Sequence, residues 1–266
     1  MEKFPPHENE NAQVPFGDKL TVSKISEVHI GRDKLFEFEH NPDKIIRVES
    51  FSTLEKRYKD QIDPIDVAIL GRKLYKELEN AYGIFAPVDY VAGKDSKGDK
   101  VVYGITDKVD GENLDEIEVT PEITEKVELL YSSISQYYLD KSPKDEPYLA
   151  DINNASQYMY GKRKDDEFSR IYLVDTDLYI RDGKVALCNV VLWLYRHMAS
   201  VERKYGKKFT HAREIIGQIL NTPLPQNITD EQRTAAQKIN EKTKGYLEGR
   251  IPIDNKDAHP IFSNLK

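Results

Sequence analysis

The stretch that decides the fold is Ser169-Arg-Ile-Tyr-Leu-Val-Asp175-Thr-Asp177. It is a short apolar run, rich in strand-forming residues, that ends in two carboxylates one residue apart, and this pattern is typical of a buried strand. A strand that ends in Asp175 and Asp177 fixes where two sets of carboxylate oxygens point, as a hard divalent cation requires. The same text also suits a strand followed by an Asp-rich turn. Taken alone, the stretch leaves both interpretations open.

The composition describes a chain long enough for one large domain or for two lobes around a cleft. Of its 266 residues, 39% are hydrophobic and 32% are charged, which indicates a substantial core under a water-exposed surface. The net charge of −7 argues against general nucleic-acid binding and against an anionic membrane surface. We therefore expect neither nucleic acid nor membrane as a partner.

Few features of the chain indicate a compartment. The single cysteine, Cys188, lies in an apolar run and cannot form an internal disulfide, so we expect a core cysteine. Residues 1–18 are polar and lack the apolar core of a secretory signal. No apolar run approaches the roughly 20 residues that cross a bilayer. We predict a cytoplasmic protein whose residues 1–18 form a flexible leader.

Strands and helices are predicted in two separate groups along the chain. The first group holds one helix, over 64–82, and strands over 21–30, 34–38, 44–48, 85–92 and 101–106. From Thr120 the pattern is helical, apart from a small strand pair around 157–180; the later helices are predicted over 185–205, 211–221 and 229–247. Sheet and helix segregated in this way indicate an α+β fold with two lobes.

The boundary between the lobes is predicted near residue 108. We assign residues 19–108 to an N-terminal sheet lobe and residues 109–266 to a mainly helical C-terminal lobe. The linker between them, residues 107–114, is where a ligand site is expected, because ligands favour the clefts between lobes.

Two further segments lie upstream of the Asp175 strand. Thr106-Asp-Lys-Val-Asp-Gly-Glu-Asn-Leu114 is a strand end followed by an acidic linker, a glycine and a helix start. Tyr148-Leu-Ala-Asp151-Ile-Asn-Asn-Ala-Ser-Gln157 is an acidic loop between a helix and a strand. An Asx-rich turn would account for the second segment equally well.

The order of these three segments resembles the protein-kinase-like superfamily, including its aminoglycoside and choline phosphotransferase relatives. The resemblance covers about residues 20–180 and rests on several motifs rather than on one signature. It implies a two-lobed fold, with a small antiparallel sheet lobe that holds one helix and a mainly helical C-terminal lobe. It also implies ATP and Mg²⁺ as cofactors.

Within this resemblance the acidic residues receive separate roles. Asp151 takes the place of the catalytic carboxylate that accepts the proton of the attacking hydroxyl. Asp175 takes the place of the carboxylate that holds magnesium against the phosphates, with Asp177 as an accessory ligand.

The linker resembles a kinase hinge. Thr106 would be the gatekeeper, and the backbone groups of Asp107 and Val109 would bond the adenine edge. An adenine edge needs one donor and one acceptor in fixed register, which an extended backbone supplies without any particular side chain.

Two residues of the first lobe are expected to position phosphates. Arg47 stands on the third strand where a lysine is usual, and its guanidinium supplies the charge with a different geometry. Glu77, on the same helix face as Leu70 and Leu74, is the candidate carboxylate to pair with that cation. A surface glutamate beside Lys73 is the alternative.

Several positions depart from the pattern of the resemblance. Gly31 stands alone where a glycine-rich phosphate loop is expected. The second-metal position lacks a clear asparagine. Ser156 falls at the usual spacing, Gln157 one residue further is the candidate ligand, and Asn153 and Asn154 are alternatives. After Asp177 no long activation segment follows, so a docking platform for protein substrates is not visible.

The resemblance implies an ATP- and Mg²⁺-dependent phosphotransferase, and the absence of a visible docking platform in the sequence favours a small-molecule acceptor. The alternative is a catalytically weak or inactive pseudokinase-like module that binds a nucleotide or a protein partner. An unrelated α+β binding protein is the third interpretation.

Overall fold

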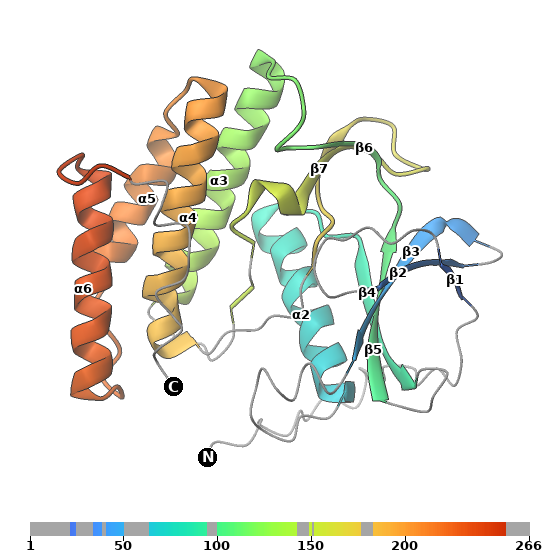
Figure 1. Ribbon diagram of the computed structural model, residues 1–266, viewed down its shortest axis with the longest axis horizontal. Helices are drawn as coiled ribbons and strands as arrows, with labels where there is room; N and C mark the ends of the chain where they lie inside the picture. The colour runs from blue at the N-terminus through green and yellow to red at the C-terminus, as the bar shows by residue number, and fades with distance from the viewer. Residues whose placement is uncertain are drawn as a thin grey trace.

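The computed structural model describes residues 22–24, 34–38, 41–50, 64–94, 100–142, 149–150, 152–176 and 183–253. Within these ranges, two antiparallel sheets and five α-helices make the fold α+β, as the sequence predicts (Figure 1). Several features of the prediction lie outside the described residues: the leader at 1–18, most of the strand predicted over 21–30, Gly31, Asp151 and Asp177.

The larger sheet forms the N-terminal part of the fold. Its five strands are antiparallel and lie in the order β1-β2-β3-β5-β4. They are β1 (Val22–Lys24), β2 (Lys34–Phe38), β3 (Asn41–Ser50), β4 (Val88–Lys94) and β5 (Lys100–Asp107). β3 begins at Asn41, three residues before its predicted start at residue 44.

The helix α2 (Pro64–Tyr82) lies between this sheet and the helical part of the molecule (Figure 1). It buries Val67, Leu74 and Leu78, which recur at helical spacing and pack in one core with residues of β4 and β5. The helix is followed by Gly83 at a φ of 65°, a left-handed conformation that favours glycine.

A second, three-stranded sheet follows the linker. It consists of β6 (Asp110–Asn113), β7 (Tyr158–Lys162) and β8 (Arg170–Leu173), in that order. The helix start predicted within 107–114 was therefore wrong, because this stretch pairs with β7 instead. Gly111 faces Gly161 across the pair, and a Cβ on either glycine would lie 2.3 Å from a backbone oxygen of the other strand. Only glycine fits at these two positions.

The C-terminal part is built from α3 (Pro121–Lys141), α4 (Gly183–Tyr205), α5 (Thr210–Asn221) and α6 (Asp230–Leu247). α3 begins as predicted at Thr120, whose hydroxyl accepts the amide of Ile123 at 3.2 Å. Cys188 of α4 is buried, as expected, and burial raises its pKa to about 11. No helix in the described ranges has the length and apolar character to cross a membrane.

The overall arrangement places a sheet with one helix ahead of a mainly helical part in the chain (Figure 1). This is compatible with the two-lobed kinase-like fold that the sequence predicts.

Candidate functional site

Arg47 of β3 and Asp175, two residues beyond β8, form an ion pair. Nη2 of Arg47 lies 2.5 Å from Oδ1 of Asp175, and both side chains are partly exposed, at 20% and 33%. The sequence assigns the first residue to phosphates and the second to a metal ion. The structure thus brings together two residues that are far apart in the chain and that were predicted for one site.

The turn that carries Asp175 is fixed by backbone contacts on both sides. The amides of Val174 and Asp175 donate to the carbonyl of Gln157, at 2.9 and 3.2 Å. On the other side, the hydroxyl of Tyr90 on β4 donates to the carbonyl of Thr176 at 3.1 Å, in a buried position. Because both contacts are to the backbone, they fix the position of the main chain from which the side chain of Asp175 projects.

Glu77 does not pair with the cation of the third strand. Its carboxylate instead accepts two hydrogen bonds from Lys141, the last residue of α3, at 2.8 and 3.0 Å. The helix phase was read correctly, because Glu77 does point inward from α2. At the C-terminal end of α2, however, the nearest opposite charge comes from α3 and not from the sheet.

The hinge backbone keeps hydrogen-bonding capacity at two of the predicted positions. The amide of Asp107 donates to the carbonyl of Pro87 at 3.1 Å, and Pro87 has no N–H with which to return a bond. The carbonyl of Asp107 accepts the hydroxyl of Thr106 at a long 3.4 Å. The amide of Val109 has no hydrogen-bond partner among the described residues. Contact with adenine stays a prediction.

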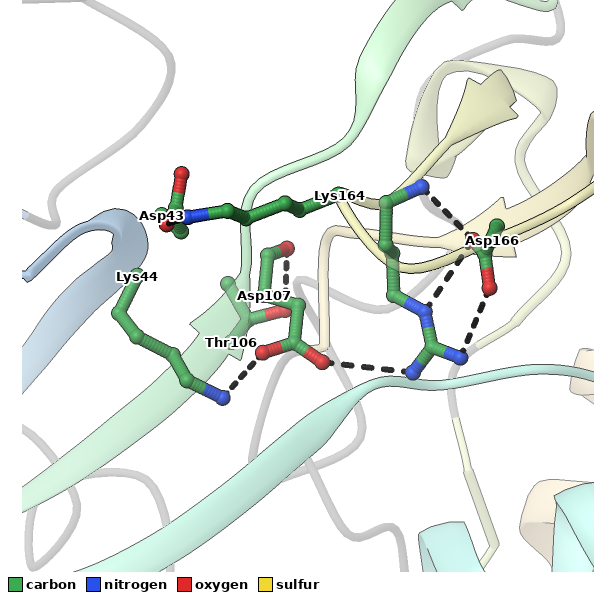
Figure 2. Close-up of polar contacts among 7 residues, drawn as sticks. Asp43, Lys44, Thr106, Asp107, Lys164 and Asp166 are labelled. Atoms are coloured by element: carbon green, nitrogen blue, oxygen red, sulfur yellow. Dashed lines mark hydrogen bonds and ion pairs between the residues drawn. The ribbon is translucent and has the colours of Figure 1, made fainter.

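The side chain of Asp107 belongs to a chain of charges that the sequence analysis missed (Figure 2). Its carboxylate pairs with Lys44 of β3 and with Nη1 of Arg163, the latter at 3.3 Å. Arg163 continues to Asp166, with an Nη2–Oδ1 distance of 3.1 Å. The contacts link the first part of β3 and the hinge to the loop between β7 and β8.

The far end of this charge chain is buried. Asp166 accepts hydrogen bonds from Arg163 and from the hydroxyl of Tyr172. The bonds from Arg163 hold the pKa of the Asp166 carboxyl well below its usual range. Burial and then the bond to Asp166 raise the pKa of Tyr172 to about 12. The run Lys162-Arg-Lys-Asp-Asp-Glu167 was the only sequence signal for this network.

The loop around Asp151 is held by tyrosine hydroxyls, although Asp151 itself lies outside the described residues. The amide of Ala150 donates to the hydroxyl of Tyr137, and its carbonyl accepts the hydroxyl of Tyr138 at 2.7 Å. The hydroxyl of Tyr158 donates to the carbonyl of Ile152 at 2.8 Å. The backbone on each side of Asp151 is therefore anchored to α3 and β7.

Gln157 has a structural role that competes with its predicted metal role. Its side-chain oxygen accepts the amide of Asn154 at 2.9 Å, as part of a capping box around the short 3₁₀ helix Ala155–Gln157. The side-chain oxygen of Asn154 accepts the amide of Ser156. That of Asn153 is buried and accepts no hydrogen bond from the described residues. Of these three amide side chains, Asn153 is the one whose oxygen accepts no hydrogen bond from the described residues.

The described residues fit a magnesium ion in chemistry, through oxygen donors such as the carboxylate of Asp175. No cluster of three or more histidine, cysteine, aspartate or glutamate side chains occurs in the part of the chain that the structure describes. A complete carboxylate ligand set would need Asp151 or Asp177, which lie beyond that part.

No family model and no curated protein matches this chain. Among solved structures it is similar to WbdD, with a TM-score of 0.34 and 13% identity over 78% of this chain and 48% of that one. A co-crystal structure of WbdD with the kinase inhibitor LY294002 gives a TM-score of 0.32 and 15% identity, over 77% and 48% of the two chains.

A third structure describes WbdD as a bifunctional kinase-methyltransferase; its TM-score is 0.33, at 13% identity over 78% and 47% of the chains. This chain spans about half the length of the WbdD chains that it matches. The likeness is distant. Neither an activity nor a substrate of this chain follows from it.

Proposed function

We propose that this chain is an ATP- and Mg²⁺-dependent phosphotransferase of kinase-like fold that acts on a small-molecule acceptor. The observation that supports it most directly is the 2.5 Å contact between Arg47 and Asp175. The kinase-like order of motifs predicts that these two residues belong to one site. Their proximity is what such a site requires.

Each residue of the proposed site has one task. Arg47 would bind phosphate oxygens with its forked guanidinium. Asp175 would hold the magnesium ion, which supplies positive charge against the phosphates when bound. Asp151 would accept the proton of the acceptor hydroxyl, from a loop whose flanking backbone is anchored by tyrosines.

A small acceptor is favoured by the chain that follows the turn at Asp175. The helix α4 already begins at Gly183. Only residues 177–182 lie between Thr176 and the start of α4, which is short for a segment on which a protein substrate would dock.

A second candidate, a pseudokinase-like binding module, is favoured by the contact of Glu77. Because Lys141 engages Glu77, the carboxylate that was expected to steady Arg47 is committed to α3. Such a module would bind nucleotide in the same place without turnover.

Thermal unfolding with ATP, with and without Mg²⁺, tests the shared part of both candidates. A ligand at about 100 times its Kd stabilises the native state by about 2.7 kcal/mol, so a metal-dependent rise in Tm is expected. Asp175→Asn should abolish the metal-dependent part of that rise. Asp89→Asn is the matched control, because Asp89 pairs with Arg72 at 2.5 Å elsewhere on the sheet lobe.

Turnover separates the two candidates. With a panel of small hydroxyl and amine acceptors, the enzyme should transfer phosphate, and Asp151→Asn should slow this transfer by about 10² or more. Nucleotide binding without turnover on the whole panel would favour the binding module. Absence of any Tm shift at millimolar ATP would exclude both.

A further inference from the structure

Arg47, Gly104 and Tyr90 form one row across three neighbouring strands. Arg47 of β3 lies opposite Gly104 of β5, and Gly104 lies opposite Tyr90 of β4. Residues directly opposite each other project from the same face of a sheet. The two side chains therefore flank a glycine on one face, the face that also carries Ala92 and Val102 into the main core.

Both side chains of this row reach the same turn beyond β8. Arg47 pairs with the carboxylate of Asp175 at 2.5 Å, and Tyr90 donates its hydroxyl to the carbonyl of Thr176 at 3.1 Å. Tyr90 is 1% exposed and Thr176 is 6% exposed, so this second contact is shielded from water. Two strands of the larger sheet thus hold two consecutive residues of the turn.

Gly104 leaves the space in which the two side chains converge. A Cβ at this position would lie 3.4 Å from Cε1 of Tyr90 and 3.9 Å from Cβ of Arg47. A methyl group would already be in van der Waals contact on both sides. A branched side chain would have to displace Tyr90, Arg47 or both.

Under the proposed function, the two contacts would respond differently to a bound metal–nucleotide complex. Arg47 and Asp175 carry opposite charges, and under the proposed function each would exchange the other for a phosphate or a metal ion. The bond from Tyr90 to Thr176 joins a neutral hydroxyl to a neutral carbonyl and is shielded from water. The bond between Tyr90 and Thr176 is therefore expected to persist when Arg47 and Asp175 exchange partners.

We propose that Tyr90 is a positioning residue that ties the metal-binding turn to the sheet, so that Asp175 stays within reach of the Arg47 site. This inference rests on the proposed phosphotransferase or nucleotide-binding function. It predicts that the Tyr90 hydroxyl contributes to metal-dependent nucleotide affinity without touching either ligand.

Tyr90→Phe tests the proposal, because it removes the hydroxyl and keeps the ring. Tyr195→Phe is the control, since Tyr195 also donates a buried hydroxyl to a backbone carbonyl, that of Tyr246 at 3.0 Å, within the helical part. The first measurement is hydrogen exchange of the Val174 and Asp175 amides, without any ligand. Exchange should accelerate in Tyr90→Phe and stay unchanged in Tyr195→Phe.

The second measurement is Mn²⁺ binding, followed by the loss of the free-ion electron paramagnetic resonance signal, in the presence of a non-hydrolysable ATP analogue. The Kd of Mn²⁺ should rise about threefold to tenfold in Tyr90→Phe, the size expected for one hydrogen bond. Binding of the analogue without metal should be unchanged. Gly104→Val should reproduce the effect by crowding Tyr90, whereas Gly104→Ala should not.

The outcomes separate the inference from the function on which it rests. Unchanged amide exchange in Tyr90→Phe overturns the anchoring role, whatever the ligand result. Faster exchange with an unchanged Mn²⁺ Kd overturns the positioning role. If the wild type binds no Mn²⁺–nucleotide complex, the proposed function fails and the positioning role fails with it, while the exchange data still report the contact itself.

Discussion

Two polar contact regions of the larger sheet, one at the hinge and one beyond β8, differ in how their charges are satisfied. At the hinge, Asp107 lies between Lys44 and Arg163, and Arg163 continues to the buried Asp166 (Figure 2). At the turn beyond β8, the carboxylate of Asp175 pairs with one cation among the described residues, Arg47, and is 33% exposed.

The difference indicates which region holds the fold and which one is suited to bind ligands. A carboxylate that already lies between two cations gains little from a third cation. A buried carboxylate is costly to separate from its cation. A partly exposed carboxylate with a single partner can exchange that partner for a metal ion. We therefore expect substitutions at the hinge to lower stability and substitutions at the turn to lower affinity.

The largest effect is expected from Arg163→Ala. Asp166, whose side chain is 6% exposed, loses its cation in this variant. The free energy of unfolding should fall by about 1–3 kcal/mol, the cost of leaving a buried acceptor poorly satisfied. Chemical denaturation measures it. Arg170→Ala is the control from the same hairpin. Arg170 stacks on Phe85, so its loss should lower the free energy of unfolding by less. Equal losses in the two variants would refute the structural role of the Arg163–Asp166 pair.

Arg47→Ala should show the opposite profile. We expect the affinity for Mg²⁺–ATP to fall by about tenfold or more, because a charged donor to phosphate is lost. The loss of stability should be smaller than in Arg163→Ala, since Asp175 can turn toward water. Calorimetric titration measures the affinity, and chemical denaturation measures the loss of stability. Arg47→Lys should recover part of the affinity; an unchanged Kd in Arg47→Ala would remove Arg47 from the site.

The hinge network should also give the protein an acid-dependent stability. Because the pKa of Asp166 is lowered in the folded state, its ionised form stabilises the fold above the ordinary value of 3.8, and this contribution is lost as the pH falls further. The Tm difference between wild type and Asp166→Asn should be constant near neutral pH and shrink below about pH 4. A difference that grows toward acid would contradict the assigned pairing.

The smallest effect is expected at Lys164, which pairs with Asp43 at 2.6 Å on the surface. Exposed ion pairs are screened by salt and ordered at an entropic cost. Lys164→Ala should leave the Tm unchanged at physiological ionic strength. A clear fall in Tm that disappears at high salt would show that this ion pair contributes to the stability of the hinge network.

Most of the fold was readable from local patterns. β2 and α2 match their predicted ranges, because alternation and helical spacing were bounded by clear turn and glycine signals. β6 was missed because its residues are mostly exposed and do not alternate; it exists through the pairing of Gly111 with Gly161, which sequence periodicity does not register.

The sequence predicted the residues of the candidate site better than it predicted the contacts between them. Motif order was enough to select Arg47 and Asp175, but not to show that they touch. Tyr90 and Arg163 were missed because their importance depends on partners more than fifty residues away. Glu77 was assigned the wrong partner, since helix phase gives the face of a side chain and not the element opposite it.

The tyrosines around the Asp151 loop illustrate one use for a composition that holds sixteen tyrosines and nine phenylalanines. In packing alone the two rings are nearly equivalent. At Tyr137, Tyr138 and Tyr158, however, phenylalanine would fill the core equally well and leave a buried backbone group of the loop without its partner. The hydroxyls of these core tyrosines therefore hold the loop in its conformation. Removal of one such oxygen atom would alter the conformation of the loop.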